Sequence, residues 1–89
     1  MSQSPRTLIV EDEAIVAEDL RQTVTSLGYQ VAATATSGEE AVRCAKEVGP
    51  DVVLLDIQLV GMLDGIETAN QIRRICNPAI IFITAHSDH

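Results

Sequence analysis

The chain has 89 residues, of which 46% are hydrophobic, and its formal net charge is −7. This length suits one small domain, and the hydrophobic fraction excludes a largely disordered chain. Thirteen acidic against six basic residues exclude broad binding to a phosphate backbone, so we expect no direct contact with nucleic acid.

The first predicted strand is the apolar run at residues 7–10, which Glu11, Asp12 and Glu13 follow directly. The next stretch has helical spacing of apolar residues and ends at Gly28, where a left-handed residue commonly follows a helix. The predicted inward residues of this helix are Val16, Leu20, Val24 and Leu27. Residues 29–35 then form the second predicted strand.

A capping box at Ser37 and Glu40 predicts the start of a second helix, which Gly49 and Pro50 end. Its predicted inward residues are Ala41, Ala45 and Val48. The third predicted strand, DVVLLDI at residues 51–57, is apolar on both faces, as is typical of a central parallel strand.

Asp64 is the predicted N-cap of a third helix, with Glu67 three residues further on. We expect Ile66, Ala69, Ile72 and Cys76 to face inward, and Asn77-Pro78 to end the helix. The fourth predicted strand covers residues 79–85. This βαβαβαβ order predicts a doubly wound parallel sheet with helices on both faces.

Acidic residues stand where two of these strands end. Glu11 and Asp12 follow the first strand, Asp56 ends the third, and Thr84 lies at the end of the fourth. Because the carboxyl ends of parallel strands meet at one edge, we expect these four side chains to converge there. Clustered carboxylates repel one another, and a hard cation such as Mg²⁺ relieves that repulsion. The alternative for Glu11, Asp12 and Glu13 is a favourable place at a helix N-terminus, which is the role we expect for Glu13.

An ionised carboxylate at the end of a hydrophobic strand is costly unless it is compensated. A magnesium ion beside Asp56 compensates the charge, and the strand aims the carboxylate at the sheet's edge, where solvent meets it. An aspartate in such a site can act as a nucleophile and form an acyl phosphate. The Thr84 hydroxyl is then a hydrogen-bond donor for a phosphoryl oxygen.

The segments LIVEDE, VVLLDIQL, DGIETANQIR and IIFITAHSD resemble, in order and spacing, the receiver domain of two-component response regulators. The resemblance covers residues 7–88 and implies a flavodoxin-like sheet of order 2-1-3-4-5. It implies that Asp56 accepts a phosphoryl group from the phosphohistidine of a sensor histidine kinase or a histidine phosphotransfer domain. Such a domain is a switch that takes part in its own phosphorylation and is not a separate enzyme.

The resemblance also implies the remaining roles in the site. Asp12 and Asp56 bind Mg²⁺ directly, Glu11 completes the acidic pair, and the backbone carbonyl of Gln58 is a further ligand. Thr84 is the switch hydroxyl, followed by the small residue Ala85.

The family's fifth strand, its lysine and its last two helices have no counterpart in these residues, whose only lysine is Lys46. We therefore expect a receiver domain that is incomplete at its C-terminus, with the sheet order 2-1-3-4. Its exposed last strand leads us to expect either more chain or a homodimer.

Three alternatives compete with this interpretation. A pseudo-receiver would only make protein contacts. A phosphatase or dehalogenase with an aspartate nucleophile would need a second aspartate where Gln58 stands. A dinucleotide-binding module would need a glycine-rich GxGxxG turn after the first strand, which the sequence lacks.

We expect a cytoplasmic protein that does not enter the membrane. The N-terminus has no long apolar run of a signal peptide, and no apolar run is long enough to cross a bilayer. Cys44 and Cys76 match no zinc or CxxC spacing, so we expect two free thiols in a reducing compartment.

Overall fold

The computed structural model describes residues 4–61 and 63–84, in which strands and helices alternate. In chain order they are β1 (Arg6–Val10), α1 (Ala14–Ser26), β2 (Gln30–Ala35), α2 (Gly38–Val48), β3 (Val52–Asp56), α3 (Gly65–Ile75) and β4 (Ala79–Ile83). The predicted order is confirmed, and the first three strands agree with their predicted bounds within one residue at each end. β4 ends at Ile83, so Thr84 lies just beyond it, and Ala85 lies outside the described residues.

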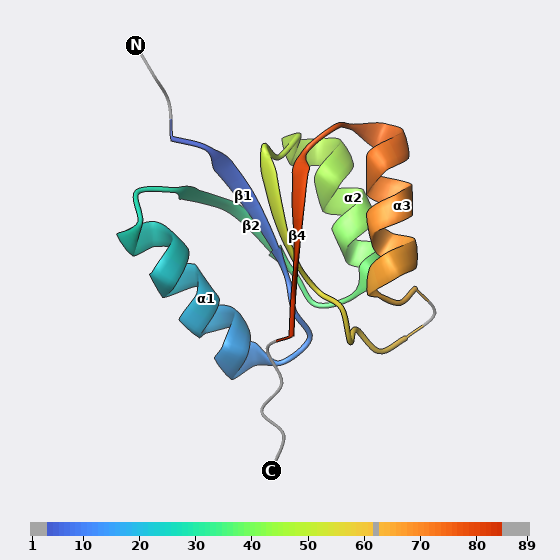
Figure 1. The fold of residues 1–89 in the computed structure, drawn as a ribbon, viewed down its shortest axis with the longest axis horizontal. Coiled ribbons are helices and arrows are strands. Elements are labelled where there is room, and N and C mark those ends of the chain that lie inside the picture. Colours follow the sequence, from blue (N-terminus) through green and yellow to red (C-terminus); the bar gives the residue numbers. More distant parts are fainter. Residues whose placement is uncertain (1–3, 62, 85–89) are drawn as a thin grey trace.

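The four strands form one parallel sheet in the order β2-β1-β3-β4, as predicted. α1 lies on one face of the sheet, and α2 and α3 lie side by side on the other (Figure 1). β3 pairs with β1 on one side and with β4 on the other, which explains why its sequence is apolar at consecutive positions. All four strands point the same way, so their carboxyl ends share one edge.

The main core lies between the sheet and the pair α2 and α3. Alternate residues of β1 and β3 point into it, because successive side chains of a strand face opposite sides. The buried members are Leu8, Val10, Ala35, Val53 and Leu55 from the strands, Ala41, Ala45, Ala69 and Ile72 from the helices, and Leu59 from the loop after β3. Alanines on α2 and α3 let both helices approach the sheet closely, and aliphatic residues fill the space between them.

Local sequence signals set where two of the helices begin. Ser37 Oγ accepts a hydrogen bond of 3.1 Å from the Glu40 backbone N–H, and Asp64 Oδ1 accepts one of 2.9 Å from Glu67 N–H. Both predicted N-caps are therefore confirmed. The Glu40 carboxylate reaches back to the Thr36 N–H, one residue before the position that a capping box predicts.

Two predicted inward residues are exposed instead. Leu27 follows the last residue of α1 and is 69% exposed, because it lines an open hollow on the α1 face of the sheet. Ile66 is 48% exposed, and Thr68 is buried on α3 in its place. The Thr68 hydroxyl donates to the Asp64 carbonyl oxygen at 2.7 Å, so its burial leaves that donor satisfied. The prediction that Ile66 faces inward is therefore wrong, because it relied only on the apolar character of this residue.

The α1 face of the sheet is covered only in part. α1 packs over β1 and β2, and a hollow of about 210 Å³ lies beside it. Leu20 and Val24 of α1, Val52 and Leu54 of β3, and Ile81 of β4 are among the residues that line this hollow. Among the described residues, no helix is long and apolar enough to cross a membrane.

Candidate functional site

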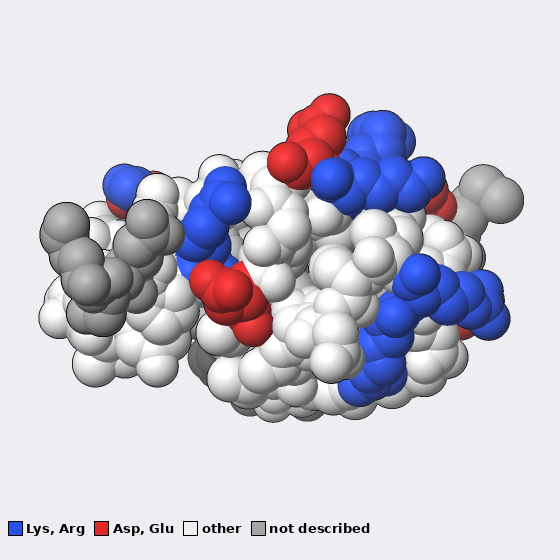
Figure 2. Space-filling model, turned by 90° about the horizontal axis from the view of Figure 1, so that it is seen from above, with Lys and Arg blue, Asp and Glu red and all other residues white. Residues whose placement is uncertain are grey.

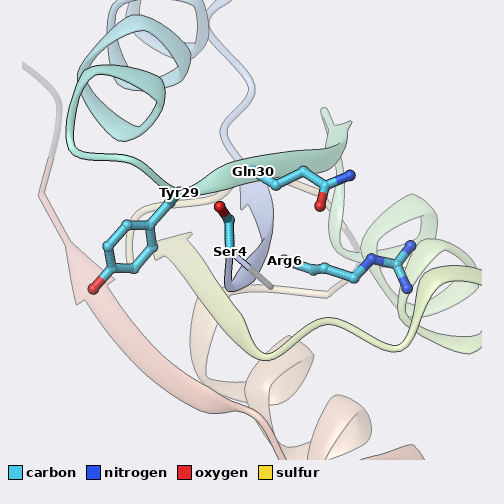
Figure 3. A pocket seen from close by; sticks show the side chains of 4 residues that line it. All are labelled: Ser4, Arg6, Tyr29 and Gln30. Carbon is cyan, nitrogen blue, oxygen red and sulfur yellow. The ribbon is translucent and has the colours of Figure 1, made fainter. Parts of the chain in front are cut away.

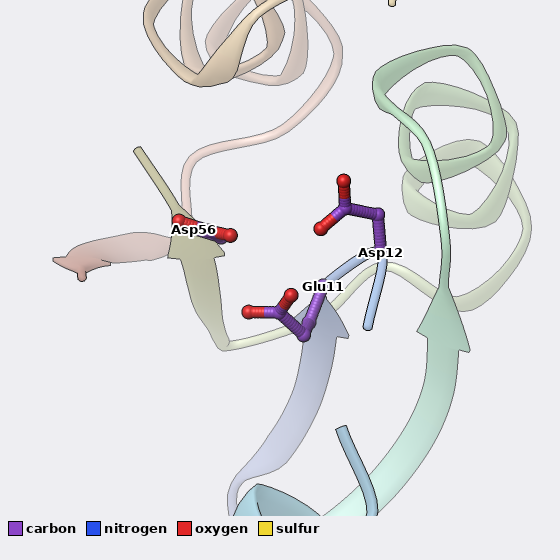
Figure 4. A group of neighbouring side chains, drawn as sticks. All are labelled: Glu11, Asp12 and Asp56. Atoms are coloured by element: carbon purple, nitrogen blue, oxygen red, sulfur yellow. The ribbon is translucent and has the colours of Figure 1, made fainter. Parts of the chain in front are cut away.

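Three carboxyl groups meet at the carboxyl edge of the sheet. Glu11 and Asp12 follow β1 directly, and Asp56 is the last residue of the neighbouring strand β3. Each offers a carboxylate oxygen within 4.8 Å of those of the other two, and the three side chains surround one space (Figure 4). The predicted convergence of Glu11, Asp12 and Asp56 is therefore what the structure shows. We call these three residues the acidic cluster.

Backbone N–H groups donate hydrogen bonds to two of these carboxylates. Glu11 Oε2 accepts a hydrogen bond of 2.9 Å from Glu13 N–H, and Asp56 Oδ1 accepts one of 2.9 Å from Gln58 N–H. In both cases the donor lies two residues further along the chain. The turn that follows each strand therefore fixes the direction of the carboxylate that precedes it.

Burial differs from the expectation at one position. Glu11 and Asp56 are both 0% exposed, whereas Asp12 is half-buried. Solvent was expected to meet Asp56 at the sheet's edge, and in this structure it does not. The Asp56 side chain is enclosed by the fold even though Ile57 and Gln58, which follow it, are exposed.

The electrostatic consequence is largest at Glu11. The pKa of Glu11 is raised from 4.5 to about 7, mainly by burial. The hydrogen bond from Glu13 N–H opposes this rise, and the neighbouring Asp12 and Asp56 contribute to it. Near neutral pH this carboxyl group is poised between its two charge states. A cation that enters the cluster would favour the ionised form.

The donor set fits Mg²⁺. The cluster offers carboxylate oxygens only, which are the ligands that a small hard cation prefers. Oxygens around an octahedral Mg²⁺ lie roughly 3 to 4 Å apart, slightly closer than the 4.8 Å limit that encloses the cluster. Each of the three residues offers a carboxylate oxygen to such an ion.

The other predicted site residues lie around this edge. Gln58 is exposed in the turn after β3, with its N–H on Asp56. Thr84 is exposed and follows Ile83, the residue that pairs with Asp56 in the sheet. Thr84 therefore lies at the same edge of the sheet as the acidic cluster.

Sequence reasoning missed one residue near the site, Gly65. This buried glycine opens α3 and lies against the backbone of Asp56 and Ile57. The available signal was the Asp-Gly pair at the start of the third helical pattern, which we assigned only to capping.

Basic residues gather at the opposite end of the molecule, where α2 and α3 end. Lys46 lies in the last turn of α2, and Arg73 and Arg74 lie in the last turn of α3, where cations favour the helix dipole. Figure 2, seen from that end, shows several basic groups and fewer acidic ones. A shallow hollow there is lined by Ser4, Arg6, Tyr29 and Gln30 (Figure 3). Its side chains include no acid and no metal ligand of the kind gathered at the other end.

Comparison with known proteins agrees with this geometry. The family model of the response regulator receiver domain matches residues 7–89. The chain is 41% identical to the chemotaxis protein CheY of Thermotoga maritima, over 88% of this chain and 64% of that protein. It is 38% identical to the transcriptional regulatory protein AfsQ1 of Streptomyces coelicolor, over 94% of this chain and 36% of that protein.

Solved structures give the same result. The signal receiver domain of a modulated diguanylate cyclase from Desulfovibrio desulfuricans is 51% identical, with a TM-score of 0.87 over 94% of this chain and 67% of that one. The response regulator PhyR of Brucella abortus is 36% identical, with a TM-score of 0.82 over 90% of this chain and 33% of that one. The chain spans between about a third and two thirds of the length of the curated relatives described above.

Proposed function

We propose that this chain, which belongs to the family of response regulator receiver domains, accepts a phosphoryl group on Asp56 and so works as a signalling switch. One observation carries the proposal: Asp56 ends a hydrophobic strand inside a cluster of three carboxylates whose oxygens lie within 4.8 Å of one another. A structural role alone does not account for three acids at this spacing, because each raises the cost of ionising the others.

In the proposed step, an Asp56 carboxylate oxygen attacks the phosphorus of a phosphohistidine. A new P–O bond forms, the P–N bond breaks, and its electron pair returns to the imidazole nitrogen. The protein's part is mainly to position the carboxylate. β3 fixes the Asp56 backbone, and the Gln58 N–H orients Oδ1.

We further propose that Asp12 and Asp56, with the Gln58 carbonyl, hold Mg²⁺ and that Glu11 lies alongside. When bound, the ion neutralises charge that develops on the phosphoryl oxygens. Asp12, the half-buried member, lies on the side from which a donor can approach. Asp56 is fully buried, so transfer requires a local movement that opens its carboxylate to the donor.

The proposed partner is a sensor histidine kinase or a histidine phosphotransfer domain in the cytoplasm. Two free cysteines agree with a reducing compartment.

Thr84 is the proposed switch residue, because it follows Ile83, the β4 residue that pairs with Asp56. Thr84→Ala should still be phosphorylated but should lose the downstream response, which a normal response in a reporter assay would contradict.

The test is the intact mass of the protein as its gene encodes it, after incubation with a small phosphodonor and Mg²⁺. The wild-type protein should gain the mass of one phosphoryl group, and Asp56→Asn should gain none. Asp19→Asn is the matched control, since Asp19 is an exposed residue of α1 outside the acidic cluster and the change is chemically the same. Undiminished labelling of Asp56→Asn would overturn the assignment.

A second candidate is a pseudo-receiver that makes protein contacts without phosphorylation. The complete burial of Asp56 favours it. The same experiment decides between the two, because a pseudo-receiver would stay unlabelled in the wild-type protein while it keeps its fold and its partner.

A further inference from the structure

α3 begins in direct contact with the backbone that carries Asp56. A Cβ atom added to Gly65 would lie 2.7 Å from the Asp56 carbonyl oxygen and 2.8 Å from the Ile57 Cα atom. Real Cβ atoms essentially never come this close, and both neighbours are backbone atoms that cannot turn away. Gly65 is not among the glycines with positive φ, so the site needs a glycine for space and not for backbone conformation.

The same short backbone segment is held from two further sides. Ile57 N–H donates to the Ile83 carbonyl oxygen of β4 at 3.0 Å, and Gln58 N–H donates to Asp56 Oδ1 at 2.9 Å. The exposed turn after β3 is therefore held in place by β4, by its own aspartate and by the start of α3.

The start of α3 is itself fixed, because two hydrogen bonds hold Asp64. Its Oδ1 accepts from Glu67 N–H, and its carbonyl oxygen accepts from the Thr68 hydroxyl at 2.7 Å. Thr68 and Ala69 are buried, so this first turn packs firmly against the molecule. A firm surface on one side of the Asp56–Ile57 peptide can set where that peptide lies.

We propose that Gly65 is a positioning residue for the acidic cluster, because its close approach sets the place of the Asp56 carboxylate and the Gln58 carbonyl. What this positioning achieves, Mg²⁺ binding and phosphoryl transfer, rests on the function proposed above. A methyl group at position 65 displaces either the turn or α3. Mg²⁺ requires near-ideal octahedral geometry, so a small displacement of two ligand atoms weakens binding.

The test compares Gly65→Ala with Gly49→Ala in the protein as its gene encodes it. Gly49 follows α2 with φ of 53°, and no atom lies within 4 Å of a Cβ added there, so alanine strains the backbone without touching the acidic cluster. Both variants should lower the urea midpoint. Only Gly65→Ala should shift the Ile57 and Gln58 amide resonances of the metal-free protein and weaken Mg²⁺ binding by about tenfold in a titration with the metal alone.

A second pair of variants covers the case in which Gly65→Ala does not fold. Asp64→Asn removes a charge but keeps an N-cap side chain, whereas Asp64→Ala removes both. The proposal expects weaker Mg²⁺ binding in Asp64→Ala than in Asp64→Asn, because only alanine releases the first turn of α3. Equal binding in this pair would contradict the proposal.

The outcomes distinguish failure of the proposed function from failure of the role assigned to Gly65. A wild-type protein that neither binds Mg²⁺ nor accepts a phosphoryl group overturns the proposed function, and the amide resonances of Ile57 and Gln58 still test the positioning. A wild-type protein that does both, with Gly65→Ala equal to Gly49→Ala in Mg²⁺ affinity and amide resonances, overturns the role of Gly65 alone.

Discussion

At the scale of single residues, neighbouring acids in one run differ because their backbones differ. Glu11 and Asp12 belong to the acidic cluster, whereas Glu13 is the N-cap residue of α1 and gives its backbone N–H to Glu11. The Glu13 side chain makes no capping hydrogen bond, and the residue is exposed. Position relative to the end of β1 therefore separates the members of the acidic cluster from a residue on the surface.

We therefore expect Asp12→Ala to weaken Mg²⁺ binding and slow phosphorylation by at least tenfold, since it removes a direct ligand. Glu13→Ala should change both by less than about twofold, because the Glu13 side chain lies outside the acidic cluster and alanine keeps the backbone N–H that holds Glu11. Isothermal titration with Mg²⁺ and the rate of phosphorylation measure the two effects. Equal losses in both variants would mean that the whole acidic run makes the site.

The raised pKa of Glu11 predicts how stability depends on pH. Its folded-state pKa, about 7, lies above the ordinary value of 4.5, so the folded protein binds this proton more tightly than the unfolded chain does. This contribution to the free energy of unfolding is fully present below pH 4.5 and is lost as the pH rises through 7. Without metal, stability should fall across this range, and added Mg²⁺ should offset the fall at the upper end.

Urea denaturation at a series of pH values, with chelator and with Mg²⁺, measures this effect. Glu11→Gln cannot ionise, so it should flatten the metal-free pH profile and isolate Glu11 from other titrating groups. A wild-type profile identical to that of Glu11→Gln would show that Glu11 does not carry the dependence.

At the scale of elements, the helices differ in how their ends are secured. α2 and α3 each begin with a side-chain cap, whereas α1 begins without one and buries only Val24. α1 also packs over β1 and β2 without covering β3 and β4. α2 and α3 pack against each other and the sheet, so they form the firmer layer on which the turn after β3 rests.

Removal of the α2 cap should be measurable on its own. Ser37→Ala should lower the free energy of unfolding by about 1 kcal/mol, because the Glu40 N–H loses its acceptor at the start of the helix. Ser26→Ala is a matched control at the exposed end of α1, where the hydroxyl donates to the Thr23 carbonyl oxygen. It should change stability by less than about 0.5 kcal/mol in urea denaturation. Equal effects would show that Ser37 is not a stabilising cap.

At the scale of the whole molecule, charge and surface polarity are unevenly arranged. The acidic cluster lies at one end of the sheet, and basic residues lie at the helix ends opposite. β4 is an edge strand within the described residues, with Ile81 49% and Phe82 36% exposed. Together with the hollow beside α1, this edge presents backbone groups and apolar side chains to a partner.

We therefore expect residues 1–89, expressed by themselves, to associate instead of forming a stable, phosphorylatable monomer. Sedimentation should show dimers or larger species, and Phe82→Lys should raise the monomer fraction, because a lysine on an edge strand opposes pairing. An exposed lysine on α1, Gln22→Lys, controls for the added charge. A monomeric chain with cooperative unfolding and several kcal/mol of stability would contradict this prediction.

The sequence by itself determined the elements and their order. Apolar runs, two N-caps and the glycines at positions 28 and 49 are local signals, and hydrogen bonds or positive φ values confirm them. It also determined that Glu11, Asp12 and Asp56 meet, because a parallel sheet brings the carboxyl ends of neighbouring strands to one edge.

Only the tertiary structure decided how the three side chains of the acidic cluster are arranged and buried. The full burial of Asp56, the raised pKa of Glu11 and the contact of Gly65 with the Asp56 backbone depend on atoms distant in sequence. The exposure of Leu27 and Ile66 likewise depends on where each helix meets the sheet. Local patterns report which conformation a segment prefers, whereas burial and pKa depend on what packs around a group. That packing is set only when all the elements assemble.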